Sequence, residues 1–316
     1  MTYLSLPILL LSMLSVLSLT TAPSYLYHDC PNTTISNNSP NKTSLISSLL
    51  SSISLYATRN IEFYSLSSYT SSHSSKIQIS VNVSDPDISD PVYGFFLCRG
   101  DVTAEVCKDC VAFASNDVVQ RCPTKMVAVI WYDECMIRYS DAPFFSTMAT
   151  DPAVYLVNTQ NTTEQERHNQ LLNTTMIDLA SQASEFPAGA KKFGTKEVNF
   201  SQFQTMYNLV QCTPDLSSTD CNTCLQVAIQ TLPNCCGGKQ GGRVLYPSCY
   251  VRYELYPFYQ MVDTTPATAP TPRLVLPPPI SPGSLGGPKD KSQIPTVTIV
   301  AIVAPIAASV VLFFFG

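Results

Sequence analysis

Ten of the twelve cysteines belong to two copies of one spacing pattern. Both copies read C-x8-C-x2-C-x11-C-x12-C, and each cysteine of the second copy lies 114 residues after its counterpart in the first. Five coincidences at a single offset indicate the tandem duplication of a cysteine-rich module. The two copies are Cys98, Cys107, Cys110, Cys122 and Cys135, followed by Cys212, Cys221, Cys224, Cys236 and Cys249.

Cysteines in C-x2-C pairs could exchange electrons, hold zinc or form structural disulfides. Neither pair has the Gly-Pro or aromatic flanks of an oxidoreductase, and the three histidines (His28, His73 and His168) lie far from both pairs in the sequence. Twelve cysteines in a regular array are typical of a protein from an oxidising compartment. We therefore predict structural disulfides, no metal site and no cofactor.

Length and charge exclude several classes of function. A chain of 316 residues has room for about two ordinary domains. With 13% charged residues and a net charge of −5, it lacks the basic surface that nucleic acids require. It also shows no Ser/His/Asp set, phosphate-binding loop or pair of catalytic carboxylates, so we predict that it is not an enzyme.

The N-terminal region predicts secretion. Leu6 to Leu19 is an apolar stretch with small residues and Ala22 after it, which indicates a signal peptide over residues 1–24. An N-terminal membrane anchor is the alternative, but the stretch is short for a membrane span. Seven N-x-S/T sequons follow and predict a glycoprotein: Asn32, Asn37, Asn41, Asn82, Asn161, Asn173 and Asn199.

The C-terminal region predicts a membrane anchor. Residues 261–293 are rich in proline and cannot form a core, so we interpret them as a stalk. Residues 294–315 carry no charge, and a helix of that length spans about 33 Å, enough to cross a bilayer. A glycolipid-attachment signal, with small residues at Ser281 to Gly287, is the alternative. We predict a plasma-membrane protein with extracellular modules.

Hydrophobic periodicity predicts an α+β fold for residues 25–143. Helices are expected from Thr43 to Tyr56 and from Thr103 to Asp117. A Ser-rich loop is expected at 65–75, and strands at 76–83, 93–98, 125–132 and 135–139. Two helices would then pack on one antiparallel sheet. Arg99-Gly100-Asp101 matches an integrin-type tripeptide, but a turn whose acid caps the following helix explains it better.

Residues 151–260 repeat this pattern. Apolar residues from Leu171 to Ala180 mark the first helix, and Ser217 to Asp220 forms a capping box that opens the second. Segments 198–203 and 206–210 flank a loop, and segments 241–246 and 249–256 form a hairpin. We therefore predict two tandem, disulfide-linked α+β modules.

The cysteine spacing and the phrases "YGFFLCRGDV", "YDECMIRYSD" and "GGRVLYPSCYVRYELYPFY" resemble a known plant family. They are similar to the cysteine-rich repeat module, also called the salt stress response/antifungal or ginkbilobin-homologous domain. Two such modules before a stalk and a span resemble the ectodomain of plant cysteine-rich receptor-like kinases. No protein kinase sequence follows the predicted span in this chain.

The resemblance implies a disulfide pattern. It pairs Cys30 with Cys122, Cys98 with Cys107, Cys110 with Cys135, Cys212 with Cys221, and Cys224 with Cys249. The second module lacks a counterpart of Cys30, because Val157 occupies that position, and it has Cys235 beside Cys236 instead. We predict a vicinal disulfide for these two, with a free thiol or a rearranged pairing as the alternatives.

The resemblance also implies a mannose-binding site formed by Asn158, Arg243 and Glu254 in the second module. In the first module the equivalent positions hold Pro31, Val129 and Ser140. A sugar site suits these residue types because Arg donates, Glu accepts and Asn does both. The alternative is an Arg–Glu cross-strand pair that only stabilises the sheet.

Two functions compete. The first is the ligand-perceiving ectodomain of a truncated or kinase-less receptor-like kinase in stress or defence signalling. Its partners would be an apoplastic ligand, such as a mannose-type glycan, and a co-receptor or a second copy of the chain. The alternative is a plasmodesmal or secreted mannose-type carbohydrate-binding protein with an antifungal role. The sequence beyond Gly316 would separate the two.

Overall fold

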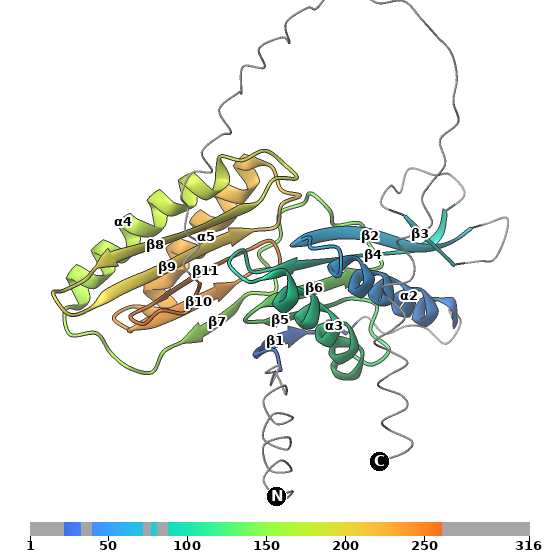
Figure 1. The fold of residues 1–316 in the computed structure, drawn as a ribbon, viewed down its shortest axis with the longest axis horizontal. Coiled ribbons are helices and arrows are strands. Elements are labelled where there is room, and N and C mark those ends of the chain that lie inside the picture. The colour runs from blue at the N-terminus through green and yellow to red at the C-terminus, as the bar shows by residue number, and fades with distance from the viewer. Residues whose placement is uncertain (1–21, 33–39, 72–76, 81–87, 261–316) are drawn as a thin grey trace, which may run out of the picture. The chain divides into compact units, whose positions relative to one another are not determined.

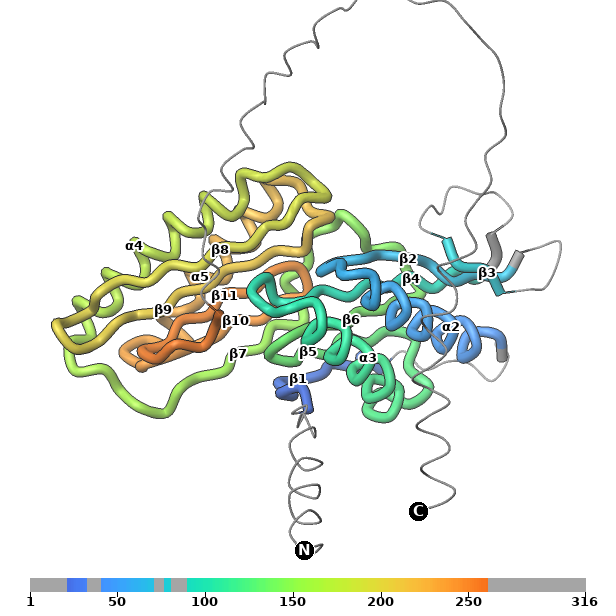
Figure 2. The backbone as a smooth tube through the Cα atoms, viewed as in Figure 1, coloured from blue at the N-terminus to red at the C-terminus, as the bar shows by residue number. Residues whose placement is uncertain are grey.

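The computed structural model describes residues 22–32, 40–71, 77–80 and 88–260. These residues form two modules in sequence order, module one (residues 25–143) and module two (residues 151–260), which Figure 2 shows as a continuous backbone trace. In each module two helices cover one face of an antiparallel sheet (Figure 1). The fold class is therefore α+β, as predicted.

Module one contains six strands and two helices among the described residues. In chain order they are β1 (Tyr25–Asp29), α2 (Pro40–Ala57), β2 (Phe63–Ser71), β3 (Ile77–Ser80), β4 (Ile88–Cys98), α3 (Ala104–Arg121), β5 (Ala128–Tyr132) and β6 (Cys135–Ser140). The strand order across the sheet is β1-β5-β6-β4-β2-β3.

Module two repeats this arrangement with one strand fewer among the described residues. Its elements are β7 (Val154–Val157), α4 (Gln165–Ser184), β8 (Lys192–Asn199), β9 (Thr205–Cys212), α5 (Ser218–Cys236), β10 (Gly241–Leu245) and β11 (Cys249–Glu254). The order β7-β10-β11-β9-β8 matches that of module one without β3. The duplicated cysteine pattern thus corresponds to a duplicated topology.

Each module has its own hydrophobic core between its helices and its sheet. In module one Leu45, Leu49 and Ile53, at helical spacing on α2, are completely buried. In module two Met176 and Leu225 contribute from α4 and α5. Burying side chains of this size stabilises a fold by about 1.5–3 kcal/mol each, so the amphipathic pattern of the helices determines which face meets the sheet.

The helices that carry the C-x2-C pairs start at defined caps. The Ser217 hydroxyl accepts from the backbone N of Asp220 at 3.0 Å, as the predicted capping box requires. In module one the cap is Thr103, whose hydroxyl accepts from the backbone N of Val106 at 3.3 Å. The prediction that the acid of Arg99-Gly100-Asp101 caps this helix was wrong. Asp101 is buried and pairs with Arg99 instead.

The prediction of a Ser-rich loop at 65–75 was also wrong for most of its length. Residues up to Ser71 belong to β2, which pairs with both β3 and β4. Serine has little strand propensity, but Ser67 and Ser68 are completely buried, and the Ser67 hydroxyl donates to the carbonyl of Ser80 at 3.1 Å. Strand pairing on both sides overrides the local preference.

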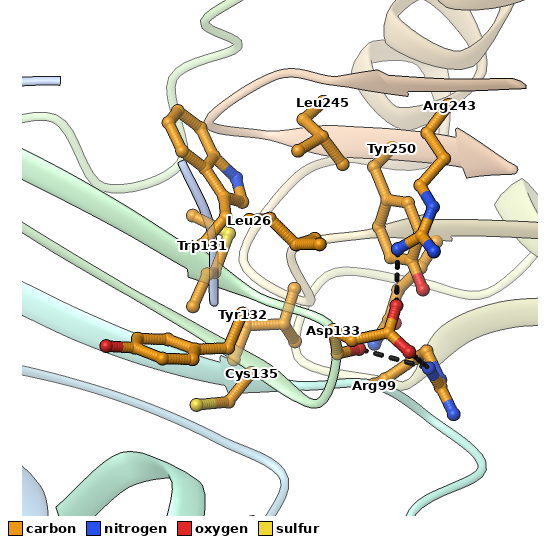
Figure 3. A pocket seen from close by; sticks show the side chains of 12 residues that line it. Leu26, Arg99, Trp131, Tyr132, Asp133, Cys135, Arg243, Leu245 and Tyr250 are labelled. Carbon is orange, nitrogen blue, oxygen red and sulfur yellow. Dashed lines mark hydrogen bonds and ion pairs between the residues drawn. The ribbon is translucent and has the colours of Figure 1, made fainter. Parts of the chain in front are cut away.

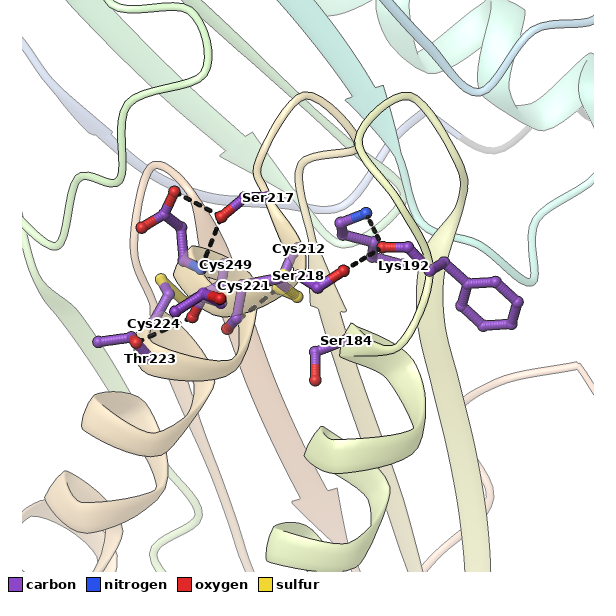
Figure 4. The surroundings of a disulfide bond; sticks show 12 residues. Ser184, Lys192, Cys212, Ser217, Ser218, Cys221, Thr223, Cys224 and Cys249 are labelled. Atoms are coloured by element: carbon purple, nitrogen blue, oxygen red, sulfur yellow. Dashed lines mark hydrogen bonds between the residues drawn. A yellow bond between two sulfur atoms is a disulfide. The ribbon is translucent and has the colours of Figure 1, made fainter.

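Six disulfides join all twelve cysteines. Five of them are the pairs that the resemblance implied, and the sixth is the predicted vicinal disulfide. They are Cys30–Cys122, Cys98–Cys107, Cys110–Cys135, Cys212–Cys221, Cys224–Cys249 and Cys235–Cys236. Figure 4 shows the surroundings of Cys212–Cys221 and Cys224–Cys249 in module two, which link the first turns of α5 to β9 and β11. Such cross-links stabilise a small module chiefly by constraining its unfolded chain.

Several predicted segments lie partly or wholly outside the described residues. These are positions 1–21 of the signal peptide, the stalk, the predicted span, and the sequons at Asn37 and Asn82. Among the described residues, no helix combines the length and apolarity that crossing a bilayer requires. The sequon asparagines in the described part of the chain are all exposed: Asn32, Asn41, Asn161, Asn173 and Asn199.

Candidate functional site

A third apolar cluster contains residues of both modules. It lies on the sheet faces that the helices leave uncovered and joins Phe95, Trp131 and Met136 of module one to Val154 and Leu245 of module two. Apolar side chains therefore occupy both faces of the central strands, as in a sandwich of two sheets. This cluster is the apolar part of the contact between the modules.

Asp133 is the centre of the polar part of this contact. It lies in the turn between β5 and β6, and its carboxylate forms ion pairs with three arginines. Arg243 and Arg252 of module two approach Oδ1 at 2.5 and 3.1 Å, and Arg99 of module one approaches Oδ2 at 3.0 Å. Figure 3 shows the ion pairs of Asp133 with Arg243 and Arg99. One carboxylate of module one thus binds two guanidinium groups of module two.

Two further carboxylates complete the network. Asp101 binds Arg99 through two hydrogen bonds, of 2.5 and 2.9 Å, and Glu254 Oε1 accepts from Arg252 Nε at 3.2 Å. We call these six residues the Asp133 network: Asp133, Arg99, Arg243, Arg252, Asp101 and Glu254. Three positive and three negative groups balance formally, which is the condition under which buried charges are tolerated.

The electrostatics of Asp133 follow from this arrangement. Burial by itself raises the pKa of the Asp133 carboxyl, but the positive charges of Arg243, Arg252 and Arg99 together hold the pKa below its ordinary value. The pKa of Arg99 is raised because its hydrogen bonds and charge interactions with Asp101 outweigh its burial. Asp133 and Arg99 therefore both carry their charges at neutral pH.

A small cavity lies between the Asp133 network and the apolar cluster. Leu26, Trp131, Leu245 and Tyr250 line it together with Arg243 (Figure 3). Its volume is about 30 Å³, which is room for about two water molecules and too little for a sugar ring. The buried Trp131 Nε1 has no hydrogen-bond partner among the described residues.

The contact between the modules is nearly two-fold symmetric. The Arg252 guanidinium stacks on Phe258 at 3.8 Å, and its counterpart Arg138 stacks on Phe144 at 4.2 Å. Each module also sends the segment that follows its last strand to the other module. The Gln260 amide donates to Asp101 at 2.9 Å, and the Ser146 amide donates to Asp215 at 2.7 Å.

These four pairs obey the 114-residue offset of the cysteines. The same surface of both modules is therefore used in the same way, as in an isologous dimer. Arg243 breaks the symmetry, because its counterpart in module one is Val129, which is buried. Asp133 breaks it too, because its counterpart in module two is Pro247.

The predicted sugar-binding residues lie on this contact face. Strand pairing places Gly241 opposite Glu254 and Arg243 opposite Arg252, so Arg243 and Glu254 are diagonal neighbours. The Arg243 guanidinium is bound by Asp133, and Glu254 is buried, with its Oε2 atom lacking a hydrogen-bond partner. Glu254 forms its ion pair with Arg252. The predicted alternative, a cross-strand pair of Arg243 with Glu254, therefore named the wrong arginine.

Asn158 follows β7 at the same end of the sheet. Its backbone N donates to the carbonyl of Gly241 at 3.0 Å, and its side-chain Oδ1 accepts from the backbone N of Gln160 at 2.9 Å. The side chain therefore stabilises a turn. Asn158, Arg243 and Glu254 occupy one end of one sheet face, yet each already has a structural role.

Sequence reasoning missed Asp133 and Arg252. A usable signal was present for Arg252, because its counterpart Arg138 recurs in the first module at the duplication offset. No signal of this kind existed for Asp133, since the duplication gives it no acidic counterpart. Only the pairing of the two modules reveals that an acid of one module meets arginines of the other.

Among the described residues, one group has metal-like proximity: His28, Cys30 and Cys122. The two sulfur atoms are joined to each other in a disulfide and so are not the thiolates that a metal binds.

Comparisons with known proteins identify the family of the two modules and solved structures with the same fold. A family model described as salt stress response/antifungal matches residues 29–142 and 156–256, which are the two modules. The chain belongs to this family. Two solved structures share its fold over 74% of the chain: the tandem DUF26 ectodomains of the Arabidopsis thaliana cysteine-rich receptor-like proteins PDLP5 and PDLP8. Their TM-scores are 0.57 and 0.58, and their sequence identities are 24% and 21%. The match covers 100% and 99% of those chains.

Curated proteins similar to this chain include cysteine-rich receptor-like protein kinases of Arabidopsis thaliana. The chain is 45% identical over 267 residues to cysteine-rich receptor-like protein kinase 25, a match that covers 84% of this chain and 37% of the relative. It is 39% identical over 248 residues to putative cysteine-rich receptor-like protein kinase 9, covering 78% of this chain and 86% of the relative. The chain spans less than half the length of the first relatives that it matches.

Proposed function

We propose that this chain is the extracellular, ligand-perceiving part of a membrane-anchored cysteine-rich receptor-like kinase that acts in stress or defence signalling. The observation that carries the proposal is the match to kinase 25, which covers most of this chain but only 37% of the relative. The described residues form two cysteine-rich modules and no catalytic domain. Any phosphorylation would therefore require a kinase domain or partner beyond the described residues.

The contact between the modules supports this role. The Asp133 network and the shared apolar cluster join the modules into one body, so a ligand bound to either module would act on both. The segment leaving module two is part of the same contact, through Phe258 on Arg252 and Gln260 on Asp101. This segment leads into the proposed stalk, which gives a physical route from the modules toward the membrane.

A topology experiment tests the proposal. The full chain is expressed in plant cells with one epitope tag between residues 24 and 25. We expect the tag to react with a membrane-impermeant label on intact protoplasts and to remain with the membrane fraction at high salt. An intracellular tag, or a tag released into the medium as soluble protein, would contradict the proposal.

A second experiment tests the signalling part. Residues 1–316 replace the matched region of kinase 25, and phosphorylation of the chimera is followed after treatment with fungal or bacterial wall extracts. We expect a ligand-dependent increase that disappears in the chimera carrying Asp133→Ala, which uncouples the modules. A chimera that reaches the cell surface but responds to none of the extracts would count against a perceiving role for these modules.

Mannose-type carbohydrate binding remains the alternative. Glu254 Oε2 is buried without a partner, as a residue awaiting a hydroxyl donor would be, but Arg243 is bound to Asp133. A sugar would therefore have to displace Asp133. If this alternative holds, Asp133→Ala should strengthen binding on a mannose array, whereas Arg243→Ala and Glu254→Ala should abolish it. Absence of binding in the parent and all three variants would eliminate this site.

A further inference from the structure

The disulfide between Cys235 and Cys236 differs from the other five in position and in exposure. It joins neighbouring residues at the C-terminal end of α5, whereas every other disulfide joins separate elements. The Cys235 side chain is partly exposed, and Cys236 is buried. Among the remaining ten cysteines only Cys30 is also partly exposed. Small reagents can therefore reach two disulfides at most.

The equivalent position in module one shows which covalent link module two lacks. Cys122, the counterpart of Cys236, is bonded to Cys30 and ties the end of α3 to the segment after β1. Strand register confirms that Val157 replaces Cys30, because Asp29 pairs with Val129 in module one as Leu156 pairs with Arg243 in module two. Module two thus has no covalent link between α5 and its first strand.

Loop closure explains why the two bonds differ in importance. Cys30 and Cys122 are 92 positions apart, whereas Cys235 and Cys236 are adjacent. The entropy that a cross-link removes from the unfolded chain grows with the length of the loop that it closes. Opening the Cys235–Cys236 bond therefore releases much less of the unfolded chain than opening Cys30–Cys122.

The backbone around the vicinal pair is held by contacts that do not need the sulfur–sulfur bond. The Tyr253 hydroxyl donates to the carbonyl of Cys236 at 2.8 Å, and the Lys239 amide donates to the same carbonyl at 3.2 Å. Gly242 of β10 lies so close that an added Cβ would meet the Cys236 sulfur at 2.8 Å. The site is therefore built by the fold and would persist with two thiols in place of the disulfide.

We propose that Cys235–Cys236 is a thiol-exchange site that reacts with small thiols while the five other disulfides and the fold remain intact. A thiolate RS⁻ attacks the exposed Cys235 sulfur, the Cys235–Cys236 bond breaks, and Cys236 leaves as a thiolate that takes up a proton. A second RS⁻ attacks the mixed disulfide at its R-bearing sulfur and releases Cys235 as a thiolate, which is also protonated. The sum is two RSH plus one protein disulfide, giving RSSR and two protein thiols.

The test is the order in which the disulfides open. The full secreted chain is incubated with increasing ratios of reduced to oxidised glutathione and alkylated with iodoacetamide, and the labelled peptides are identified by mass spectrometry. We expect Cys235 and Cys236 to be labelled first, at least about tenfold faster than any other pair. Far-UV circular dichroism should remain unchanged over the same range.

Two variants separate the vicinal pair from its competitor. Cys235→Ser/Cys236→Ala should lose the first two equivalents of label while its melting temperature stays near that of the parent. Cys30→Ser/Cys122→Ser should keep the early label but melt at a clearly lower temperature. Early labelling at Cys30 and Cys122, or labelling of Cys235 only together with loss of the fold, would overturn the proposal. If the first variant fails to fold, the order of labelling in the parent still decides the matter.

Discussion

Replacing Asp133 with alanine should weaken the contact between the modules more than removal of any other charged side chain of the Asp133 network. Asp133→Ala leaves Arg99 with Asp101 and Arg252 with Glu254, but it leaves Arg243 without a carboxylate. Two of the three guanidinium groups, those of Arg99 and Arg243, then line a cavity of about 30 Å³ with little water to solvate them. The reason for the loss is therefore uncompensated positive charge as well as a missing ion pair.

The expected magnitude follows from the burial of the partners. Removing one member of a fully buried ion pair costs about 3–5 kcal/mol. The Asp133 side chain is 24% exposed and Arg243 is 16% exposed, so solvent screens part of this interaction. We expect a loss of about 2–4 kcal/mol in the free energy of unfolding, which for a unit of this size lowers the melting temperature by roughly 4–16 °C.

A double-mutant cycle separates this effect from a general loss of packing. The free energy of unfolding is measured by urea titration for the parent, Asp133→Ala, Arg243→Ala and the double variant. We expect the double variant to be less destabilised than the sum of the single variants, by about 1–3 kcal/mol. Asp109→Ala, which removes an exposed acid of α3, is the control and should change the stability by less than about 0.5 kcal/mol.

The reasoning is refuted if the two single variants add up without coupling, or if Asp133→Ala is as harmless as the control. Either result would mean that the apolar cluster alone holds the modules together. A loss far above the expected range, with separate melting of the two modules, would instead show that the Asp133 network dominates the contact.

Three further predictions concern other parts of the chain. Burial lowers the pKa of His168, whose ring nitrogens have no hydrogen-bond partner among the described residues, so stability should fall as the pH drops below about 6.5, by at most about 1.4 kcal/mol per pH unit. Urea titration at several pH values should show that His168→Leu flattens this profile. Gly94→Val should cost about 1–3 kcal/mol in unfolding free energy, because a Cβ there would lie 2.8 Å from Leu49, while the exposed Phe203→Ser should leave the stability unchanged. A phosphatidylinositol-specific phospholipase should leave the modules on intact cells if residues 294–315 span the membrane, and their release would support the lipid-attachment alternative.

The sequence predicts the modules well because their signals are local or duplicated. The amphipathic helix around Leu49 and the capping box at Ser217 are each determined within a few residues, and both occur as expected. The cysteine pattern is specific enough that the resemblance implied five of the six pairs, and the sixth, Cys235–Cys236, is the predicted vicinal disulfide. The counterpart of Cys30 could be placed at Val157 because the helices that follow align.

The candidate site was less predictable because it depends on which surfaces meet. The types and positions of Arg243 and Glu254 suit a sugar. In the tandem arrangement module one covers this sheet face and supplies Asp133 to Arg243. Nothing local to β10 or β11 encodes that partner, so the sequence of module two by itself could not reveal it.

The restriction of every disulfide to one module has a consequence for biosynthesis. Each of the six bridges of the described residues joins two cysteines of the same module. Cys135, the last cysteine of module one, precedes Cys212 by 77 positions. At a synthesis rate of about 5–20 residues per second, that gap gives module one roughly 4–15 s of oxidation before the next cysteine emerges. The twelve cysteines can therefore be oxidised in two successive sets of six, one set for each module. The noncovalent contact around Asp133 then assembles last.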